Sequence, residues 1–598
     1  MKKQRYQTLL EENRLQLQTL QKNDNRLSTL RLLAFLGAAA CFWWGLSQRV
    51  IWVTLAGFVL LLVFFYLVYS HSRVRRQREL AKNRGQVLEG YLARFGEEWK
   101  QFAETGKEFL EQDAFCAQDL DLLGETSLFQ FLCVANTGRG KRLLADWLCE
   151  AEPQPEQLLR RQQAVKELCG KREFSLHFQT LSRGLRGKEQ ARAEQGIQRF
   201  IAYGEQALSS TPRWGEALCL LLPAVTLASL LLAALGALSP YVGAACAALQ
   251  FIISMGGYRR NTGLLAPLFS FSRSLEHFAA LFEAIQRENF TSPLLRDLQK
   301  ELNRSGGVTK GIRSLNAIGE AVHIRHNPIL YFLLSSLLLW DFHCVLALER
   351  WKKSYGGQVR GWFATVSELE ALLSLAVLGD VREEVCFPDL RREETPLVQA
   401  ERLSHPLIPE KQAVANDISL KAQTCVITGS NMSGKTTFLR SIGVNLALCY
   451  AGAPVCARRF TASCMRVMTS MRVQDDVSRG ISTFYAELLR IKGMVEFSRS
   501  GRPLLVLIDE IFKGTNSADR VVGATETIRR LALPWVITLV STHDFELCAL
   551  ERDPAVNAVN YHFREYYEDD QIRFDYRLLP GRCTTTNARA LMRLVGIL

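Results

Sequence analysis

The chain has 598 residues, of which 48% are hydrophobic and 22% charged, and this composition excludes a mainly disordered protein. Its 73 Lys and Arg residues outnumber its 60 Asp and Glu residues, and the net charge of +13 suits an anionic partner, either nucleic acid or an acidic membrane surface. The 15 cysteines include no C-x-x-C pair, so they predict reduced core thiols of an intracellular protein and neither a zinc site nor a disulfide framework.

The first predicted elements form a membrane hairpin. Residues 1–31 predict a polar, basic helix, and residues 32–69 are apolar apart from a Ser-Gln-Arg break at 47–49, which predicts two spans and a short turn. Basic residues flank the hairpin on both sides and predict that both ends stay in the cytoplasm. A cleaved signal peptide is the alternative, and it is disfavoured because a second span follows at once. Residues 70–110 predict a helical linker.

A helical pattern with few strand signals covers residues 111–385 and predicts an all-α core domain. Residues 217–257 interrupt it with a second pair of apolar segments, which meet at Ser239 and Pro240 and predict another hairpin with both ends cytoplasmic. A buried helical hairpin in a soluble core is the alternative for this pair. A third apolar run, residues 329–340, is too short to span a bilayer and predicts a core helix.

Strand and turn signals begin near residue 386 and alternate with helical patterns, which predicts an α/β domain over residues 386–598. Within it a β-type run at 425–428 leads into G-x-x-x-x-G-K-T at 429–436, and a helical pattern follows. This order predicts a P-loop, in which backbone N–H groups and the positive end of the helix hold phosphates. The predicted nucleotide-binding residues are Gly429, Ser430, Asn431, Met432, Ser433, Gly434, Lys435, Thr436 and Thr437.

Two of these residues and one acid predict a magnesium site. Lys435 is expected to neutralise the β- and γ-phosphates, and the Thr436 hydroxyl to bind Mg²⁺. The buried strand predicted at 504–508 ends in Asp509. We expect this strand to neighbour the one before the P-loop, because a carboxylate there supplies the second contact to Mg²⁺. The predicted metal ligands are therefore Thr436 and Asp509, and the cofactors are ATP and Mg²⁺.

The residues expected to perform the reaction follow the same strands. Glu510 is placed to polarise a water molecule that attacks the γ-phosphate. A further strand at 535–540 leads to His543, which is expected to sense the γ-phosphate by hydrogen bonding. The predicted catalytic residues are Glu510, His543 and Lys435.

These pieces in this order resemble the ATPase domain of the DNA mismatch-repair MutS family. The resemblance rests on residues 428–437 (TGSNMSGKTT), 480–488 (GISTFYAEL), 509–516 (DEIFKGTN) and 541–547 (STHDFEL), and it continues upstream through residues 119–132, 137–148 and 161–168. The Leu-Ser-Gly-Gly-Gln signature of ABC transporters is absent from the sequence. The fold expected from this resemblance is a P-loop ATPase domain of the ABC/MutS type, preceded by an all-α core and lever domain that carries the membrane hairpins.

The resemblance also implies an assembly. In the MutS family the ATPase works as a dimer with two composite sites, so a homodimer through the ATPase domains is expected. By the same resemblance Ser482 would reach the nucleotide of the partner subunit, and Thr515, Asn516 and Ser517 would line the subunit contact. The mismatch-reading domain of the family stands at the N-terminus, where this chain has its first apolar hairpin.

Three hypotheses for function follow from these features. The first is an ATP hydrolase of the MutS type, anchored in the cell membrane by four transmembrane helices, with its N-terminus, core and ATPase domain in the cytoplasm. The second is a switch module in which ATP controls binding to duplex or mismatched DNA. The third is a transport-like or membrane-remodelling motor, which the near absence of ionisable groups in the apolar segments disfavours.

Overall fold

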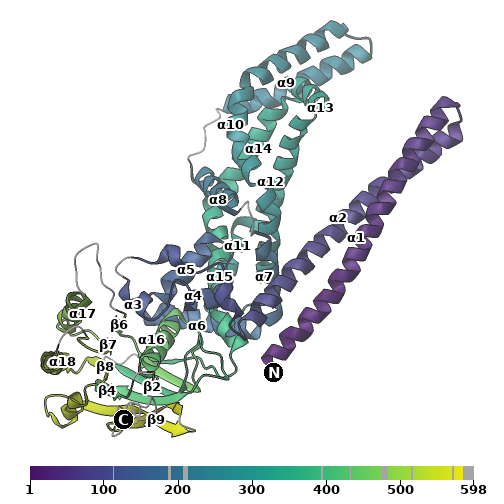
Figure 1. Cartoon of the computed structure of the whole chain (residues 1–598). Coiled ribbons are helices and arrows are strands. Elements are labelled where there is room, and N and C mark those ends of the chain that lie inside the picture. The colour runs from purple at the N-terminus through teal and green to yellow at the C-terminus, as the bar shows by residue number, and fades with distance from the viewer. Residues whose placement is uncertain are drawn as a thin grey trace.

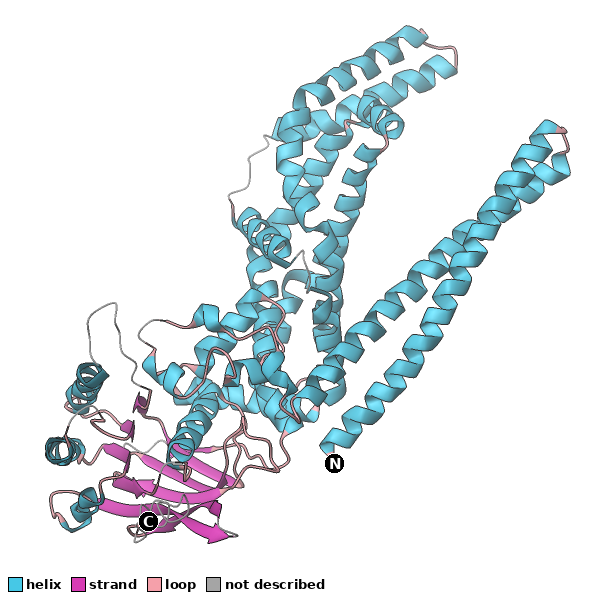
Figure 2. Cartoon of the chain, in the orientation of Figure 1, coloured by secondary structure: helices cyan, strands magenta, loops and turns pink. Residues whose placement is uncertain are grey.

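The computed structural model describes residues 1–111, 114–185, 190–206, 213–391, 395–430, 432–472, 483–513, 516–568 and 571–583. Helices make up the chain as far as residue 381, and a mixed α/β domain follows (Figure 2). The predicted order of an all-helical part and an α/β domain is confirmed.

A long helical hairpin forms an arm that projects from the body (Figure 1). It consists of α1 (Lys2–Ser47) and α2 (Ile51–Ala93), so each predicted span continues without a break into a polar helix. No proline interrupts either helix. The polar base of the arm is fixed to the body, where Tyr6 stacks on Tyr91 with ring centroids 4.8 Å apart and the Gln179 amide donates to the Tyr91 hydroxyl at 2.9 Å.

The helical core is built around α15, which is buried along nearly its whole length. Its helices are α3 (Phe115–Asp119), α4 (Leu128–Leu132), α5 (Gly138–Leu148), α6 (Pro155–Gly170), α7 (Arg172–Ser182), α8 (Gln190–Glu205), α11 (Pro293–Asn303), α12 (Val308–His323), α14 (Trp340–Tyr355) and α15 (Val359–Val381). Short 3-10 turns connect some of them: η1 (Glu98–Gln101), η2 (Lys107–Phe109), η3 (Arg183–Leu185), η4 (Arg304–Gly306), η5 (Ile324–His326) and η6 (Gly356–Gln358).

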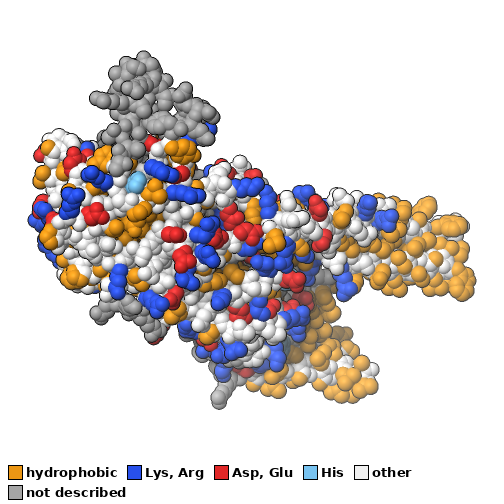
Figure 3. All heavy atoms as spheres, turned by 90° about the horizontal axis from the view of Figure 1, so that it is seen from below, with side chains coloured by type: hydrophobic (Ala, Val, Ile, Leu, Met, Phe, Trp, Pro, Cys, Tyr) orange, Lys and Arg blue, Asp and Glu red, His pale blue; other side chains and the backbone are white. Residues whose placement is uncertain are grey.

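A lever rises from this core and carries the second apolar hairpin at its tip (Figure 1). The hairpin consists of α9 (Arg213–Ala234) and the first half of α10 (Pro240–Arg287), and α13 (Pro328–Leu338) lies beside it. The tips of the arm and of the lever lie on the same side of the molecule, away from the α/β domain. Hydrophobic side chains cover the outer parts of both projections (Figure 3).

Five helices among the described residues are long and apolar enough to cross a membrane, judged by length and composition. Four of them are the apolar stretches of α1, α2, α9 and α10, where at most 22% of the most apolar window is buried. In the fifth, Trp340–Val381, 83% of the most apolar window is buried. Protein therefore already surrounds this segment, which forms the centre of the helical core.

The apolar run at 329–340 differs from its prediction. Most of it forms α13, and Ile329, Leu330, Phe332 and Leu333 are exposed, Ile329 to 83%. The prediction of a core helix is therefore wrong. The length and polarity of the run did not predict this exposure, because they do not show which other helices a short apolar helix contacts.

The α/β domain contains two sheets among the described residues (Figure 2). The larger has the order β10 (Gln571–Pro580), β9 (Ala558–Glu568), β4 (Thr424–Thr428), β8 (Val536–Thr542), β7 (Leu504–Asp509) and β6 (Arg466–Ser470). Its strands are parallel except for the antiparallel pair of β9 and β10. The smaller sheet has the order β1 (Asp389–Arg391), β5 (Arg459–Ser463), β2 (Leu397–Leu403) and β3 (Asn416–Lys421).

In the described part of the domain the sheets are accompanied by α16 (Lys435–Ala451), α17 (Thr483–Ser498), α18 (Ser517–Leu531) and the 3-10 segment η8 (Phe545–Arg552). The central strands β4 and β8 are buried throughout, as expected for parallel strands covered by helices on both faces. The carboxyl ends of parallel strands meet at one edge of the sheet, and the predicted site residues follow those ends.

Candidate functional site

The loop between β4 and α16 is shaped by two glycines in conformations that other residues rarely adopt. Gly429 has a φ of 150° and Gly434 a φ of 107°. A side chain at Gly429 would also approach the Phe563 carbonyl oxygen to 2.8 Å, so the neighbouring strand β9 leaves no room for one. The sequence therefore needs glycine here to bring the backbone close to β9 and to turn into α16.

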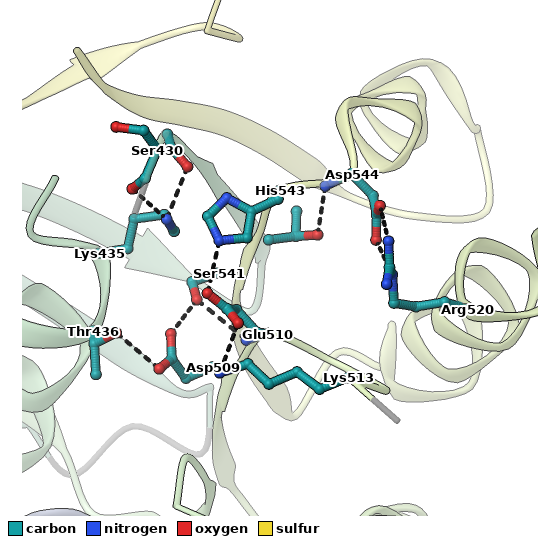
Figure 4. A network of polar contacts seen from close by, with 12 residues as sticks. Ser430, Lys435, Thr436, Asp509, Glu510, Lys513, Arg520, Ser541, His543 and Asp544 are labelled. Atoms are coloured by element: carbon teal, nitrogen blue, oxygen red, sulfur yellow. Dashed lines mark hydrogen bonds and ion pairs between the residues drawn. The ribbon is translucent and has the colours of Figure 1, made fainter. Parts of the chain in front are cut away.

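Lys435, the first residue of α16, folds back over this loop (Figure 4). Its ammonium group donates to the carbonyl oxygens of Gly429 and Ser430, both at 2.8 Å. Burial lowers the pKa of Lys435. The Ser433 hydroxyl is also buried and has no hydrogen-bond partner among the described residues.

Thr436 links the loop to the predicted acid pair. Its hydroxyl donates to one carboxylate oxygen of Asp509 at 2.8 Å, and the Ser541 hydroxyl donates to the other oxygen (Figure 4). The expectation that the strand of Asp509 directly neighbours β4 is wrong, because β8 lies between β4 and β7. Thr436 still reaches Asp509 because it stands on α16, and the intervening strand contributes Ser541.

Glu510 lies in a strained backbone conformation beside this contact. Its φ is 55°, in the left-handed region, and such strain costs about 1–3 kcal/mol in a non-glycine residue. One oxygen of its carboxylate lies 2.7 Å from Nε2 of His543, and the other lies 2.6 Å from Nζ of Lys513. The hydrogen bond from His543, together with Lys513, lowers the pKa of Glu510 to about 2. Glu510 is therefore an ionised carboxylate near neutral pH.

The residue after His543 ties the end of β8 to α18. Asp544 accepts two hydrogen bonds from the Arg520 guanidinium, at 2.6 and 2.7 Å. Asn516 caps the first turn of α18 by accepting from the Asp519 N–H at 2.9 Å. The pairing of Asp544 with Arg520 holds α18 against the strand end that carries His543 (Figure 4).

A cavity of about 690 Å³ opens beside the loop. It is lined by loop residues, by Glu510, by the segment between β2 and β3, and by three aromatic side chains of the β9–β10 pair, namely Phe563, Phe574 and Tyr576. Met432, which is 84% exposed, and Thr437 also line it. The sequence did not predict that these three aromatic side chains, called the aromatic wall below, would line the site. Their strands lie beside the loop because of the strand order in the sheet, which the linear sequence does not reveal.

The helical core reaches the same domain through one buried acid. Asp119 of α3 accepts hydrogen bonds from the Thr469 hydroxyl at 2.7 Å and from the Met471 and Arg472 N–H groups at 3.1 and 3.0 Å. Arg490 of α17 lies 3.2 Å from the same carboxylate. Sequence reasoning missed this contact because about 350 residues separate its partners.

The structure thus brings Lys435, Thr436, Asp509, Glu510 and His543 together at one edge of the sheet. The sequence did not indicate Lys513 and Ser541 as parts of the site, although both stand within the motifs that contain the predicted acids and histidine. Asn431, Ser482 and Thr515 lie outside the described residues, and Asn516 and Ser517 form the start of α18.

Comparison with known proteins relates part of the chain to MutS proteins. Residues 425–597 match the family model of MutS domain V, a segment that contains the loop, both acids and His543. A DNA mismatch repair protein MutS from Exiguobacterium sp. (strain ATCC BAA-1283 / AT1b) is 34% identical to this chain over 250 residues, which cover 40% of this chain and 29% of the relative. The chain therefore matches less than a third of the length of this curated relative.

Proposed function

From the match of residues 425–597 to MutS domain V, we propose that the chain is a membrane-anchored ATPase of the MutS type that binds and hydrolyses ATP with Mg²⁺. The observation that carries the proposal is the hydrogen bond of 2.8 Å between Thr436 and Asp509. It joins the glycine loop to the strand end that bears an ionised Glu510, and these are the parts that phosphoryl transfer to water requires.

The loop has the donors that a triphosphate needs. The Lys435 ammonium group donates only to loop carbonyl oxygens, which phosphate oxygens would replace as stronger acceptors. The buried Ser433 hydroxyl and the N–H groups at the start of α16 are further donors. Phe574 and Tyr576 offer flat surfaces on which the base would stack in the adjoining cavity.

The two acids have different roles, Asp509 in metal binding and Glu510 in activating the water. Thr436 and Asp509 would hold Mg²⁺, which neutralises phosphate charge when bound, and Ser541 orients the Asp509 carboxylate. Glu510 orients the attacking water and accepts its proton. Its contacts with His543 and Lys513 keep it ionised, and His543 is within reach of both Glu510 and the phosphate side of the site.

The tip of the lever supports a membrane anchor through its distribution of polarity. Residues 217–258 contain no Asp, Glu, Lys or Arg. The side chains exposed on the outside are apolar, among them Leu220, Leu221, Val225, Leu231, Leu249 and Ile252. The side chains buried between the helices include the polar residues Thr226, Ser229, Gln250 and Ser254. A hairpin in a soluble core has the opposite arrangement, whereas membrane helices pack through small and polar residues.

The arm supports the same anchor. Its end exposes Trp43, Trp44 and Trp52, and such aromatic residues favour the membrane–water interface. Because the tips of the arm and the lever lie on one side of the molecule, one bilayer would receive both hairpins (Figure 1). The α/β domain, the core and the N-terminus would then lie together in the cytoplasm, and two chains would complete composite ATP sites as a homodimer.

DNA binding is a second candidate, favoured by the name of the matched relative, a DNA mismatch repair protein. The lever tip offers no cations to phosphates, so DNA would have to contact other surfaces of the chain. Titration of the solubilised protein with homoduplex and mismatched DNA at several salt concentrations separates the candidates. A steep salt dependence together with tighter binding of the mismatch would favour DNA recognition, and no binding at low salt would exclude it.

Glu510→Gln tests the hydrolase itself. In full-length protein purified in detergent, this variant should still bind ATP while its rate of phosphate release falls by about 10²–10⁴-fold, because the group that accepts the proton is lost. The exposed Glu526→Gln, on the outer side of α18, is the matched control and should keep the parent rate. Equal rates in the parent and in Glu510→Gln would refute the assigned role.

A further inference from the structure

The short helix α13 interrupts the lever between α12 and α14. The chain leaves the lever at Asn327, which caps α13 by accepting from the Leu330 N–H at 3.2 Å, and returns at Leu339, whose φ is 50°. Trp340 then donates to the Ala321 carbonyl oxygen at 2.8 Å, so the start of α14 lies against the end of α12. The 11 residues of α13 therefore form a separate element at the end of the α12–α14 pair.

The exposed residues of α13 are apolar, and its buried residues are polar. Ile329, Phe332 and Leu333 are exposed, with Ile329 at 83%. Ser335 and Ser336 are buried. The described residues leave each of these three apolar side chains more than half exposed, although side chains of this size are normally the ones that a soluble protein buries.

Two buried charges fix α13 in this position. Asp341, which is 1% exposed, accepts from the Tyr331 hydroxyl of α13 at 2.7 Å and from Nε of Arg325 at 2.9 Å. Arg325 also donates to the Thr262 hydroxyl of α10 at 3.0 Å. One network therefore joins the segment before α13, α13 itself, the start of α14 and the neighbouring helix α10.

The level of α13 along α10 follows from two ring contacts. Phe332 meets Phe251 with centroids 4.8 Å apart, and Tyr331 meets Tyr258 at 6.5 Å. The basic pair Arg259-Arg260 follows directly and marks the end of the apolar part of α10. Phe251 and Tyr258 are seven residues apart, which corresponds to about 10 Å of helix. Helix α13 therefore lies beside the part of the apolar segment that is nearest to the basic pair, which is the depth at which interfacial helices rest.

We propose that α13 is a fifth membrane contact, a helix embedded in the cytoplasmic leaflet with Ile329, Phe332 and Leu333 against lipid. The inference rests on the proposed anchoring of α9 and α10, with whose exposed apolar surface the outer face of α13 is continuous. It adds a site at which the end of the lever touches the bilayer without crossing it. A displacement of the lever would then also displace α13 at the membrane surface, because the hydrogen bonds around Asp341 join the two.

A photo-crosslinking amino acid tests this contact in the full-length protein reconstituted into phospholipid nanodiscs. The benzophenone side chain is introduced in place of Ile329, which is 83% exposed, or in place of Phe332, which is 55% exposed and also contacts Phe251. Leu231 on the outer face of α9 reports on the hairpin, and Ser314, an exposed residue of α12, is the matched control on the lever. Mass spectrometry then measures phospholipid adducts.

We expect lipid adducts at Phe332, Ile329 and Leu231, on the order of tenfold above Ser314, because only the first three lie within the apolar slab. Adducts at Leu231 without adducts at Phe332 and Ile329 would overturn the inference and leave the anchor standing. The absence of adducts at all three positions would overturn both. Crosslinks from Phe332 to a second protein chain, in place of lipid, would show that a protein covers this face and would also overturn the inference.

Discussion

At the scale of single residues, the site depends on side chains that hold other side chains in place. Asp509 accepts hydrogen bonds from the hydroxyl groups of Thr436 on α16 and Ser541 on β8. Glu510 forms a hydrogen bond with His543 and an ion pair with Lys513. Glu510 also keeps an unfavourable φ of 55°. Strain that persists at such a position indicates that the neighbouring contacts determine the conformation, as is common at functional sites.

Ser541→Ala should weaken the response to magnesium. The substitution removes one of the hydroxyl groups bound to Asp509, and a hydrogen bond to a charged group contributes about 1.5–3 kcal/mol, which corresponds to about 10- to 100-fold. We expect the Mg²⁺ concentration for half-maximal ATPase activity to rise within that range. Thr538→Val is the control, since the hydroxyl of this buried residue in the same strand has no hydrogen-bond partner among the described residues. An unchanged magnesium response in Ser541→Ala would argue against its role.

The lowered pKa of Glu510 gives a prediction about acid stability. Because its pKa is about 2 in the folded chain and about 4.3 in an unfolded one, the ionised group stabilises the fold above pH 4.3, and this contribution is lost as the pH falls towards 2. Glu510→Gln should therefore lower Tm at pH 7, and the difference in Tm from the parent should shrink below about pH 4.3. A difference that grows on acidification would contradict the assigned ionisation.

Much of this site was predictable from local sequence. The glycine spacing before Lys435 predicts a phosphate-binding loop, and acids at the end of an apolar run predict a strand end at the site. Both patterns are local, so these residues could be identified without knowing which strands lie next to them. Ser541, Lys513 and the aromatic wall were not, because their positions depend on β8 entering the sheet between β4 and β7 and on β10 lying at its edge. Strand order is a long-range property that a linear pattern does not contain.

At the scale of elements, α3 is one of the connections between the helical core and the α/β domain. Asp119 holds the end of β6 through three hydrogen bonds and pairs with Arg490 of α17, while Asp121 pairs with Arg440 of α16 and with Arg472. Helix α16 begins in the proposed ATP site, and Glu487 of α17 accepts a hydrogen bond from the Phe512 N–H close to that site.

Asp119→Asn should destabilise the protein by about 3–5 kcal/mol, because it removes one partner of a buried ion pair and leaves Arg490 without a compensating charge. In a double-mutant cycle with Arg490→Met, we expect the second substitution to cost much less in the Asp119→Asn background, with a coupling of about 0.5–3 kcal/mol. Thermal unfolding measures both. Additive effects would indicate that the two side chains do not interact.

The lever tip should respond to polarity in the opposite way from a soluble core. Gln250 donates to the Leu222 carbonyl oxygen at 2.9 Å within the α9–α10 interface, and interhelical hydrogen bonds in membranes contribute about 0.6–2 kcal/mol. Gln250→Leu should therefore be tolerated with a small loss of stability, whereas Leu231→Arg on the exposed face should reduce membrane insertion. Yields in the membrane fraction check both, and tolerance of Leu231→Arg would favour a soluble hairpin.

At the scale of the whole molecule, the α/β domain and two apolar projections stand at opposite ends (Figure 1, Figure 3). The apolar runs and the order of the domains were predictable because they are local in sequence. The common direction of the two tips and the exposure of α13 were not, since both depend on how helices that are far apart in the sequence pack. Together these features support the proposal of an ATPase whose helical core connects the nucleotide site to a membrane.

The most direct test of this account is equilibrium binding of Mg²⁺-ATP to the full-length protein in nanodiscs, compared with Lys435→Ala. We predict that the parent binds the nucleotide and that the variant binds it about 10- to 100-fold more weakly, because a charge-assisted hydrogen bond to phosphate is lost. Equal affinity in the two proteins, or no binding by the parent, would contradict the account.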